Sequence, residues 1–153
     1  MAIQQVHHAD TSSSKVLGQL RGKRVLITGT TGFLGKVVLE KLIRAVPDIG
    51  AIYLLIRGNK RHPDARSRFL EEIATSSVFD RLREADSEAF DAFLEERIHC
   101  VTGEVTEAGF GIGQEDYRKL ATELDAVINS AASVNFREEL DKALAINTLC
   151  LRN

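Results

Sequence analysis

The sequence is short of cysteine, of net charge and of long apolar runs. Its only two cysteines, Cys100 and Cys150, lie inside apolar segments, which predicts reduced core residues of a cytosolic protein rather than a disulfide framework or a metal site. The 20 basic and 22 acidic residues leave a formal charge of −2, without the basic field typical of nucleic-acid-binding proteins. No stretch approaches the ~18 continuous apolar residues of a membrane helix. These absences argue against a nucleic-acid partner and against a membrane span.

The first 20 residues are expected to form a flexible tail and a short helical lead-in. Residues 1–14 are polar, with neither a basic start nor an apolar core, so they do not resemble a signal peptide and favour the cytoplasm. His7 and His8 are adjacent, but two histidines in a flexible tail rarely bind a metal, and no metal site is predicted. The composition, 44% hydrophobic and 27% charged, is that of one globular domain or part of a larger one.

Four short apolar runs alternate with helical patterns along the chain. Runs of this kind are typical of buried parallel strands, and they cover 24–28, 51–56, 98–101 and 126–129. Apolar residues recur at helical spacing over 34–45, 114–124 and 138–152. The alternation predicts an α/β fold: a Rossmann-like parallel sheet with helices on both faces and strand order 3-2-1-4, truncated after about four strands.

The segment 58–96 is charge-rich and carries aromatic and aliphatic residues at helical spacing. Pro63 and Asp64 fit the first turn of a helix. The segment predicts two or three amphipathic helices. Because loops between strands and helices usually have only ~2–6 residues, we interpret it as helical cover with an insertion.

Three glycines follow the first predicted strand. Gly29, Gly32 and Gly35 have the spacing G-x-x-G-x-x-G between a strand and a helix. In this context the first glycine permits a tight turn, the second lets backbone approach a pyrophosphate, and the third lets the helix pack close to the strand. The helix N-terminus also offers N–H groups and a positive dipole end to phosphate. The alternative is a glycine-rich turn that binds nothing.

A basic residue stands where an NAD site usually has an acidic one. The acid that holds the ribose 2′-hydroxyl normally lies ~20 residues beyond the glycines, whereas Arg57 stands 22 positions after Gly35 and no acid occupies 51–62. Arg57, with Lys60 and Arg61 nearby, could hold a 2′-phosphate, which favours NADP over NAD. The alternative is a solvated basic loop.

Two further segments follow the third and fourth strands. Glu104 could accept a hydrogen bond from an adenine amine, although a solvated loop glutamate is almost as good an interpretation. Small residues over 130–134 would allow the close approach of a flat cofactor. The alternative there is a tightly packed turn.

These motifs resemble the extended short-chain dehydrogenase/reductase superfamily, and more narrowly the N-terminal part of alcohol-forming fatty acyl-CoA reductases. Related thioester reductase domains are also similar. The resemblance runs from about residue 20 to residue 153. The segments that carry it are Gly-Phe-Leu-Gly-Lys at 32–36, Leu-Leu-Ile-Arg at 54–57, Ser-Ala-Ala-Ser-Val-Asn-Phe at 130–136 and Ala-Ile-Asn at 145–147.

The resemblance implies that residues 21–153 are the N-terminal part of an NADP-binding Rossmann domain, and it implies the residues that contact NADPH. Arg57 would hold the 2′-phosphate, and Asn147 would support the turn after the fourth strand. The other implied contacts are with the pyrophosphate (Gly29, Thr31, Gly32, Phe33 and Leu34, with Gly35 beneath), with adenine (Glu104 and Val105) and along the nucleotide (Ala131, Ala132 and Ser133). Glu104 stands where the family more often has aspartate, and Asn129 where histidine is common.

The catalytic pair of the family is missing from this chain. The family transfers hydride with a serine or threonine and a Tyr-x-x-x-Lys pair, in which lysine lowers the pKa of the tyrosine. Tyr53 is followed four residues later by Arg57, and Tyr117 by Ala121. The resemblance therefore implies the NADPH-binding portion of a reductase that converts fatty acyl-CoA to fatty aldehyde or alcohol. We expect the chain alone to be inactive, with the acyl-CoA bound by parts that it lacks.

Three alternatives remain open from the sequence. The chain could be a non-catalytic NADP-sensing module, part of an extended reductase acting on a nucleotide sugar, or a structural α/β domain without a nucleotide. In each case the fourth strand would be an uncovered sheet edge and the last helix would present an apolar face to water. We expect weak stability, or association that covers this side.

Overall fold

The computed structural model describes residues 15–152. The predictions for the tail, including those for His7 and His8, lie outside the described residues. The predicted lead-in is present as a short helix, α1 (Lys15–Gln19).

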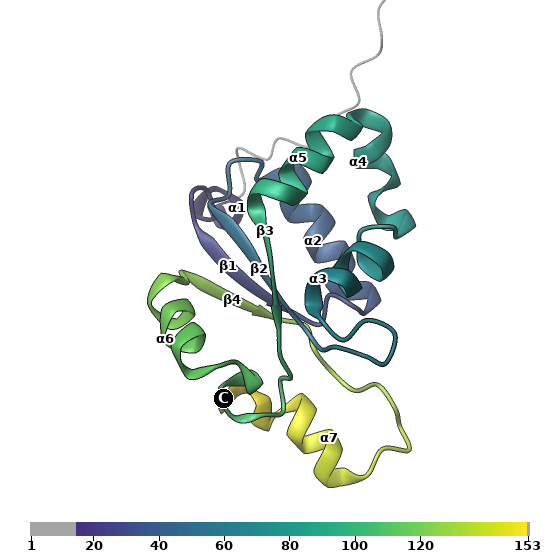
Figure 1. The fold of residues 1–153 in the computed structure, drawn as a ribbon, viewed down its shortest axis with the longest axis vertical. Helices are drawn as coiled ribbons and strands as arrows, with labels where there is room; N and C mark the ends of the chain where they lie inside the picture. Colours follow the sequence, from purple (N-terminus) through teal and green to yellow (C-terminus); the bar gives the residue numbers. More distant parts are fainter. Residues whose placement is uncertain (1–14, 153) are drawn as a thin grey trace, which may run out of the picture.

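Four parallel strands form a single sheet in the order β3-β2-β1-β4 (Figure 1). The strands are β1 (Arg24–Thr28), β2 (Ala51–Ile56), β3 (Ile98–Thr102) and β4 (Ala126–Asn129). In the register, Ile27 of β1 lies between Leu54 of β2 and Ile128 of β4. The predicted fold class and strand order are confirmed. The third strand extends one residue beyond its predicted end.

One face of the sheet is covered by the helices that follow β1 and β2. The long helix α2 (Phe33–Ala45) connects β1 to β2. Between β2 and β3 lie α3 (Ala65–Arg68), the π-helical turn η2 (Phe69–Ile73), the 3-10 turn η3 (Ser77–Phe79), α4 (Asp80–Ala85) and α5 (Ser87–Arg97). The prediction that Pro63 and Asp64 form a first helical turn is wrong. Asp64 is instead the N-cap of α3, because its carboxylate accepts a hydrogen bond from the Ser67 N–H at 2.9 Å.

The remaining helices follow β3 and β4. They are the 3-10 turn η4 (Ala108–Gly111), α6 (Gln114–Glu123), α7 (Leu140–Asn147) and the 3-10 turn η5 (Leu149–Arg152). The prediction of one helix over 138–152 is wrong. Backbone angles of φ −135° and ψ −55° at Thr148 interrupt the α-helix, which resumes only as a 3-10 turn.

The hydrophobic core lies between the sheet and the α2–α5 layer. Val25, Ile27 and Ile52 point into it from the strands, and Leu39 and Phe69 reach it from the helices; all five are 0% exposed. Helix α6 lies on the opposite side of the sheet (Figure 1), where it buries Leu120. Helices therefore occupy both faces, but the packing differs greatly between them.

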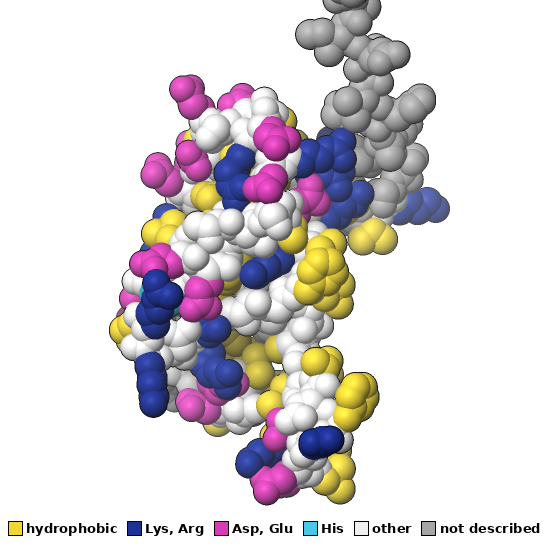
Figure 2. All heavy atoms as spheres, turned by 90° about the vertical axis from the view of Figure 1, so that its right-hand side faces the viewer, with side chains coloured by type: hydrophobic (Ala, Val, Ile, Leu, Met, Phe, Trp, Pro, Cys, Tyr) yellow, Lys and Arg dark blue, Asp and Glu magenta, His cyan; other side chains and the backbone are white. Residues whose placement is uncertain are grey.

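Large apolar side chains remain at the surface after β4. Phe136 is 104% exposed, Val134 83% and Leu140 75%, and Val127 on the edge strand is 57% exposed. In Figure 2, hydrophobic side chains are exposed at the lower end of the molecule, where α7 lies, among charged ones. The predicted uncovered edge and apolar helix face are thus present. No helix within residues 15–152 has both the length and the apolar character needed to cross a membrane.

Candidate functional site

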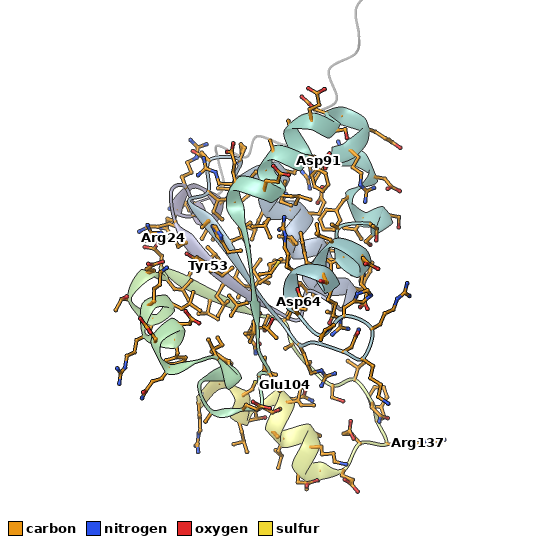
Figure 3. All side chains as sticks on the ribbon, viewed as in Figure 1. Arg24, Tyr53, Asp64, Asp91, Glu104 and Arg137 are labelled. Atoms are coloured by element: carbon orange, nitrogen blue, oxygen red, sulfur yellow. The ribbon has the colours of Figure 1, made fainter. Side chains whose placement is uncertain are left out.

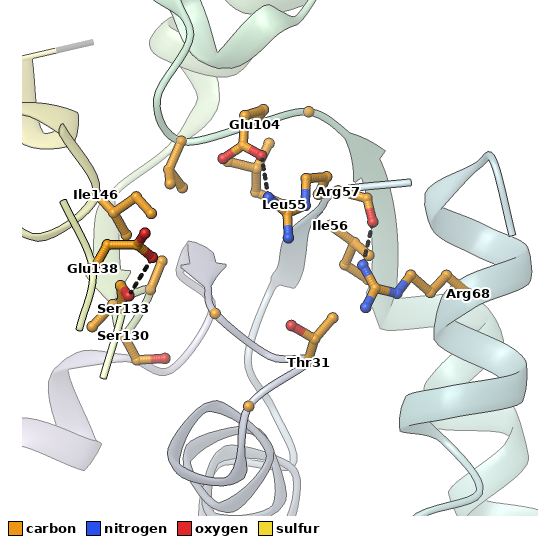
Figure 4. A pocket seen from close by; sticks show the side chains of 16 residues that line it. Thr31, Leu55, Ile56, Arg57, Arg68, Glu104, Ser130, Ser133, Glu138 and Ile146 are labelled. Carbon is orange, nitrogen blue, oxygen red and sulfur yellow. Dashed lines mark hydrogen bonds and ion pairs between the residues drawn. The ribbon is translucent and has the colours of Figure 1, made fainter. Parts of the chain in front are cut away.

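A cavity of about 430 Å³ opens at the carboxyl ends of the four strands (Figure 4). Because the strands are parallel, the segments that follow them meet at one edge of the sheet. Gly29 follows β1, Arg57 follows β2, Glu104 follows β3 and Ala131 follows β4, and all four line the cavity. This edge is where open α/β sheets bind ligands.

The glycine turn after β1 requires glycine for two separate reasons. Gly29 has φ +74°, and a Cβ there would lie 2.5 Å from the Ala131 nitrogen. A Cβ on Gly35 would collide with the carbonyl oxygen of Gly29. The turn therefore brings the start of α2 against the end of β1 and beside the segment after β4. The first N–H groups of α2 have no partner within the helix, so they are available to an anion beside the turn.

Thr28 joins the glycine turn to the segment after β4. Its hydroxyl donates to the side-chain amide oxygen of Asn129 (Oδ1) and accepts from the Ala131 N–H at 3.3 Å. The Ser130 hydroxyl donates to the Thr28 backbone carbonyl at 2.8 Å. These bonds hold the small residues after β4 against Gly29, as a wall of the cavity.

Asn147 fixes the far end of that wall. Its side-chain oxygen accepts from the Ser133 N–H at 2.7 Å, and its side-chain nitrogen donates to the Ser133 carbonyl at 3.1 Å. The Ser133 hydroxyl donates to Glu138 at 3.3 Å. Asn147 does not line the cavity itself. Its two hydrogen bonds to Ser133 connect α7 to the 130–133 segment and stabilise the conformation of that segment.

The charged wall of the cavity consists of Arg57, Arg68 and Glu104. The Arg57 guanidinium donates to the Glu104 carboxylate at 3.0 Å. Arg68 reaches the same wall from the end of α3 and donates to the Arg57 backbone carbonyl at 2.6 Å. Two guanidinium groups beside a glycine turn form a surface suited to phosphate.

A network behind Arg68 holds it in place. Its Nε donates to the Glu72 carboxylate at 2.9 Å, and the Asn59 amide donates to the other oxygen of that carboxylate at 2.8 Å. The hydrogen bond from Arg68, followed by that from Asn59, holds the pKa of the Glu72 carboxyl below its ordinary value. The Ala65 N–H donates to the Thr102 hydroxyl at 2.9 Å, which fixes the start of α3 to the end of β3.

The structure brings most of the predicted site residues together. Those that line the cavity are Gly29, Thr31, Gly32, Arg57, Glu104, Val105, Ala131, Ala132 and Ser133. Phe33 and Leu34 lie beside it at the start of α2, 78% and 62% exposed, and Gly35 packs beneath the turn. Their contacts with a cofactor stay predictions.

Sequence reasoning missed Arg68 and Glu138, which line the cavity. The only sequence signal for Arg68 is its position four residues after the N-cap Asp64, which puts it in the first turns of a helix. Lys60 and Arg61, which were predicted to accompany Arg57, are not among the cavity-lining residues. Arg61 faces Glu71 instead, at 4.0 Å.

Neither tyrosine of the chain is placed for hydride-transfer chemistry. Tyr53 lies within β2, remote from Glu104 at the carboxyl end of β3 (Figure 3). Its hydroxyl donates to Glu123 at 3.2 Å, and burial, with a contribution from Glu123, raises the pKa of Tyr53. A tyrosine that polarises a carbonyl needs the opposite shift. Tyr117 lies on α6, outside the cavity lining.

The residues present fit a dinucleotide and give no indication of a metal. The glycine turn leaves no room for a Cβ at positions 29 and 35, and the helix N-terminus and two arginines can hold anionic groups. Within residues 15–152, no group of three or more histidine, cysteine or acidic side chains is placed to hold a metal ion. Cys100 and Cys150, both among the described residues, are not in a disulfide.

Comparison with known proteins adds three findings. The family model described as "Male sterility protein", one of NAD-binding domains, matches residues 27–153. The chain is 38% identical over 133 residues to fatty acyl-CoA reductase 2, chloroplastic, of Arabidopsis thaliana, covering 87% of this chain and 21% of that protein. It is 36% identical over 131 residues to fatty acyl-CoA reductase 1 of Mus musculus, covering 86% and 24%.

Solved structures point in the same direction. The terminal R domain from the myxalamid PKS-NRPS biosynthetic pathway superimposes with a TM-score of 0.64 at 28% identity, covering 85% of this chain and 30% of that one. A thiolation-reductase di-domain from an archaeal non-ribosomal peptide synthetase gives a TM-score of 0.60 at 29% identity, covering 87% and 25%. The chain spans 21–26% of the length of the curated relatives that it matches.

Proposed function

The chain belongs to the male sterility protein family of NAD-binding domains, and from that premise we propose that it is the NADPH-binding portion of a fatty acyl-CoA reductase. Membership supports a nicotinamide cofactor. Residues 21–153 would be the N-terminal part of the cofactor domain, with 58–96 as a helical insertion. The acyl-CoA substrate rests on the names of the relatives, which are fatty acyl-CoA reductases.

The observation that carries the choice of NADPH is the position of Arg57. Arg57 lies at the carboxyl end of β2 and lines the same cavity as Gly29 and Gly32. A carboxylate at this position would bind a ribose 2′-hydroxyl and repel a 2′-phosphate, whereas a guanidinium attracts the phosphate. Arg68 adds a second positive charge to the same wall.

The residues of this chain bind and orient the cofactor. The glycine turn and the start of α2 would hold the pyrophosphate, the arginine wall the 2′-phosphate, and the small residues 131–133 the flat face of the nucleotide. When bound, NADPH supplies the hydride for reduction of a carbonyl. No tyrosine–lysine pair of this chain can polarise that carbonyl, so the chain alone is expected to be inactive.

The test is calorimetric titration of the chain with NADPH and with NADH. We expect NADPH to bind at least ~10-fold more tightly, a difference of about 1.4 kcal/mol. Arg57→Gln should remove most of this preference while NADH binding changes little. Arg61→Gln is the matched control, because it removes the same charge from the same loop at a side chain that is 82% exposed and outside the cavity lining.

Equal affinity for NADH and NADPH would contradict the choice of cofactor. Failure to bind either one, with the chain shown to be folded by circular dichroism, would contradict the proposed function. Oxidation of NADPH by the chain with a long-chain acyl-CoA would contradict the expected inactivity, because it would require a proton donor other than a Tyr-x-x-x-Lys pair.

A further inference from the structure

The Arg57 side chain has one acidic neighbour at ion-pair distance among the described residues, and it is Glu104. The two side chains come from segments that follow neighbouring strands, β2 and β3, and both line the cavity. The donor–acceptor distance is 3.0 Å. Figure 4 shows this pair on the wall of the cavity, above Thr31 of the glycine turn. The residue best placed to hold a 2′-phosphate is therefore already bound to an anion.

The carboxylate is the better anchored partner of the pair. The Glu104 N–H donates to the Phe110 carbonyl at 2.8 Å, and the Glu104 carbonyl accepts from the Glu107 N–H at 3.1 Å. The Glu104 side chain is 21% exposed, whereas that of Arg57 is 70% exposed. The loop thus fixes where the negative charge lies, and the guanidinium is the group free to change its partner.

The backbone at Arg57 is held independently of its side chain. Arg68 donates to the Arg57 carbonyl at 2.6 Å and is itself bound to Glu72 at 2.9 Å. Loss of the contact with Glu104 would therefore leave the Arg57 backbone in place. The guanidinium can turn from one anion to another without movement of the strand end.

We propose that Glu104 competes with the 2′-phosphate of the cofactor for Arg57, so that this carboxylate lowers the preference of the site for NADPH over NADH. The inference rests on the proposed function. Arginine binds phosphate through paired hydrogen bonds, but here it must first release a carboxylate. NADH carries a neutral 2′-hydroxyl and does not compete for the pair.

Glu104→Gln separates the competition for Arg57 from the hydrogen bond that Glu104 could accept from adenine. The amide keeps the length of glutamate and an oxygen that can accept a hydrogen bond from adenine, but it loses the charge that binds Arg57. In calorimetric titrations we expect NADPH to bind about threefold to fivefold more tightly, the upper range for a partly exposed ion pair. NADH affinity should change by less than about twofold on the same scale.

Glu40→Gln is the matched control. Glu40 also forms an ion pair with an arginine, Arg44, at 2.7 Å, and it lies on α2 outside the cavity lining. The substitution changes the net charge by the same amount. We expect it to leave both affinities unchanged, which would show that the effect of Glu104→Gln is local.

The double variant Arg57→Gln/Glu104→Gln decides the mechanism. If the two anions compete for Arg57, the gain from Glu104→Gln disappears when Arg57 is already glutamine. A gain that persists would assign the effect to direct repulsion and overturn the proposal. Unchanged or weaker NADPH binding by Glu104→Gln would also overturn it, while leaving the proposed function intact if the unmodified chain binds NADPH. A folded, unmodified chain that binds no NADPH would overturn both.

Discussion

The residues up to β3 and the residues after it are packed very differently. Among the described residues, twenty hydrophobic side chains are buried between Val25 and Ile98, whereas only Leu120 and Cys150 are buried beyond them. In the first region, the helices of the α2–α5 layer pack against one whole face of the sheet. The second holds the edge strand β4 and the short helices α6 and α7, with Val127 and Leu144 exposed.

The candidate site lies on the boundary between these two regions. Its glycine turn and arginine wall belong to the densely packed region, and its 130–133 wall belongs to the sparsely packed one. The two walls of the site therefore rest on regions that differ in how much buried apolar area supports them. Buried apolar area dominates folding, so substitutions in the first region should affect the whole fold, and those in the second should act locally.

The largest expected difference comes from the same substitution made in each region. Phe69→Ala removes a 0% exposed ring and should cost about 3–5 kcal/mol of unfolding free energy, because it leaves a cavity in the core. Phe136→Ala removes a ring that is 104% exposed and should cost less than about 0.5 kcal/mol. Urea unfolding followed by circular dichroism measures both; similar losses would contradict the comparison.

A second substitution tests the contact between the regions. Gly29→Ala combines a positive φ of +74° with a Cβ placed 2.5 Å from Ala131, and should cost about 2–4 kcal/mol as strain and collision add. Gly22→Ala has a similar φ of +66° and nothing within 4 Å, so it should show only the backbone cost of about 1–2 kcal/mol. Equal losses in urea unfolding would mean that the contact at Gly29 contributes nothing.

A third substitution tests whether the exposed edge leads to association. We expect the β4 edge and the apolar surface of α7 to self-associate as protein concentration rises, because an unpaired strand edge and exposed apolar side chains favour it. Val127→Lys should reduce association, while changing the unfolding free energy by less than about 0.5 kcal/mol. Sedimentation velocity measures the first and urea unfolding the second. A monomeric, unmodified chain at every concentration would refute the expectation.

The smallest expected effect is a pH dependence at the junction of β1 and β4. Lys23 donates to Asp125 at 2.8 Å and the Arg24 N–H donates to its other oxygen at 2.8 Å. These bonds, that from Lys23 first, hold the pKa of Asp125 below its ordinary value of 3.8. The folded state is therefore stabilised above that value, and this stabilisation is lost as the pH falls through the lower pKa of the folded protein.

Asp125→Asn removes the titrating group while keeping the size of the side chain. The difference in urea midpoint between the unmodified chain and this variant should be largest near neutral pH and should narrow as the pH falls below 3.8, the ordinary value of this carboxyl. Asp64 offers the same test in the densely packed region, because hydrogen bonds from Ser67 also lower its pKa. Asp64→Asn should therefore change the urea midpoint with pH in the same direction. A difference that does not change with pH would contradict the assignment.

Local patterns in the sequence were enough for most of the fold. Three strands, 24–28, 51–56 and 126–129, lie where the apolar runs predicted them. The strand order followed from the alternation of strands and helices, because parallel crossovers have few topologies. The glycine turn was predictable because the close backbone approach at Gly29 and Gly35 leaves no room for a Cβ. Only glycine fits these positions, so the turn appears in the sequence as glycines at a fixed spacing.

What the sequence determined by itself is therefore the set of strands, their order and the glycine turn, all of which depend on short-range periodicity and backbone sterics. The tertiary structure alone decided that Arg68 reaches the cavity, that Arg57 is paired with Glu104, and that the last helix breaks at Thr148. Arg57 and Glu104 are 47 positions apart. Such contacts depend on how elements that are distant in the sequence pack together. A local pattern of residues does not predict that packing.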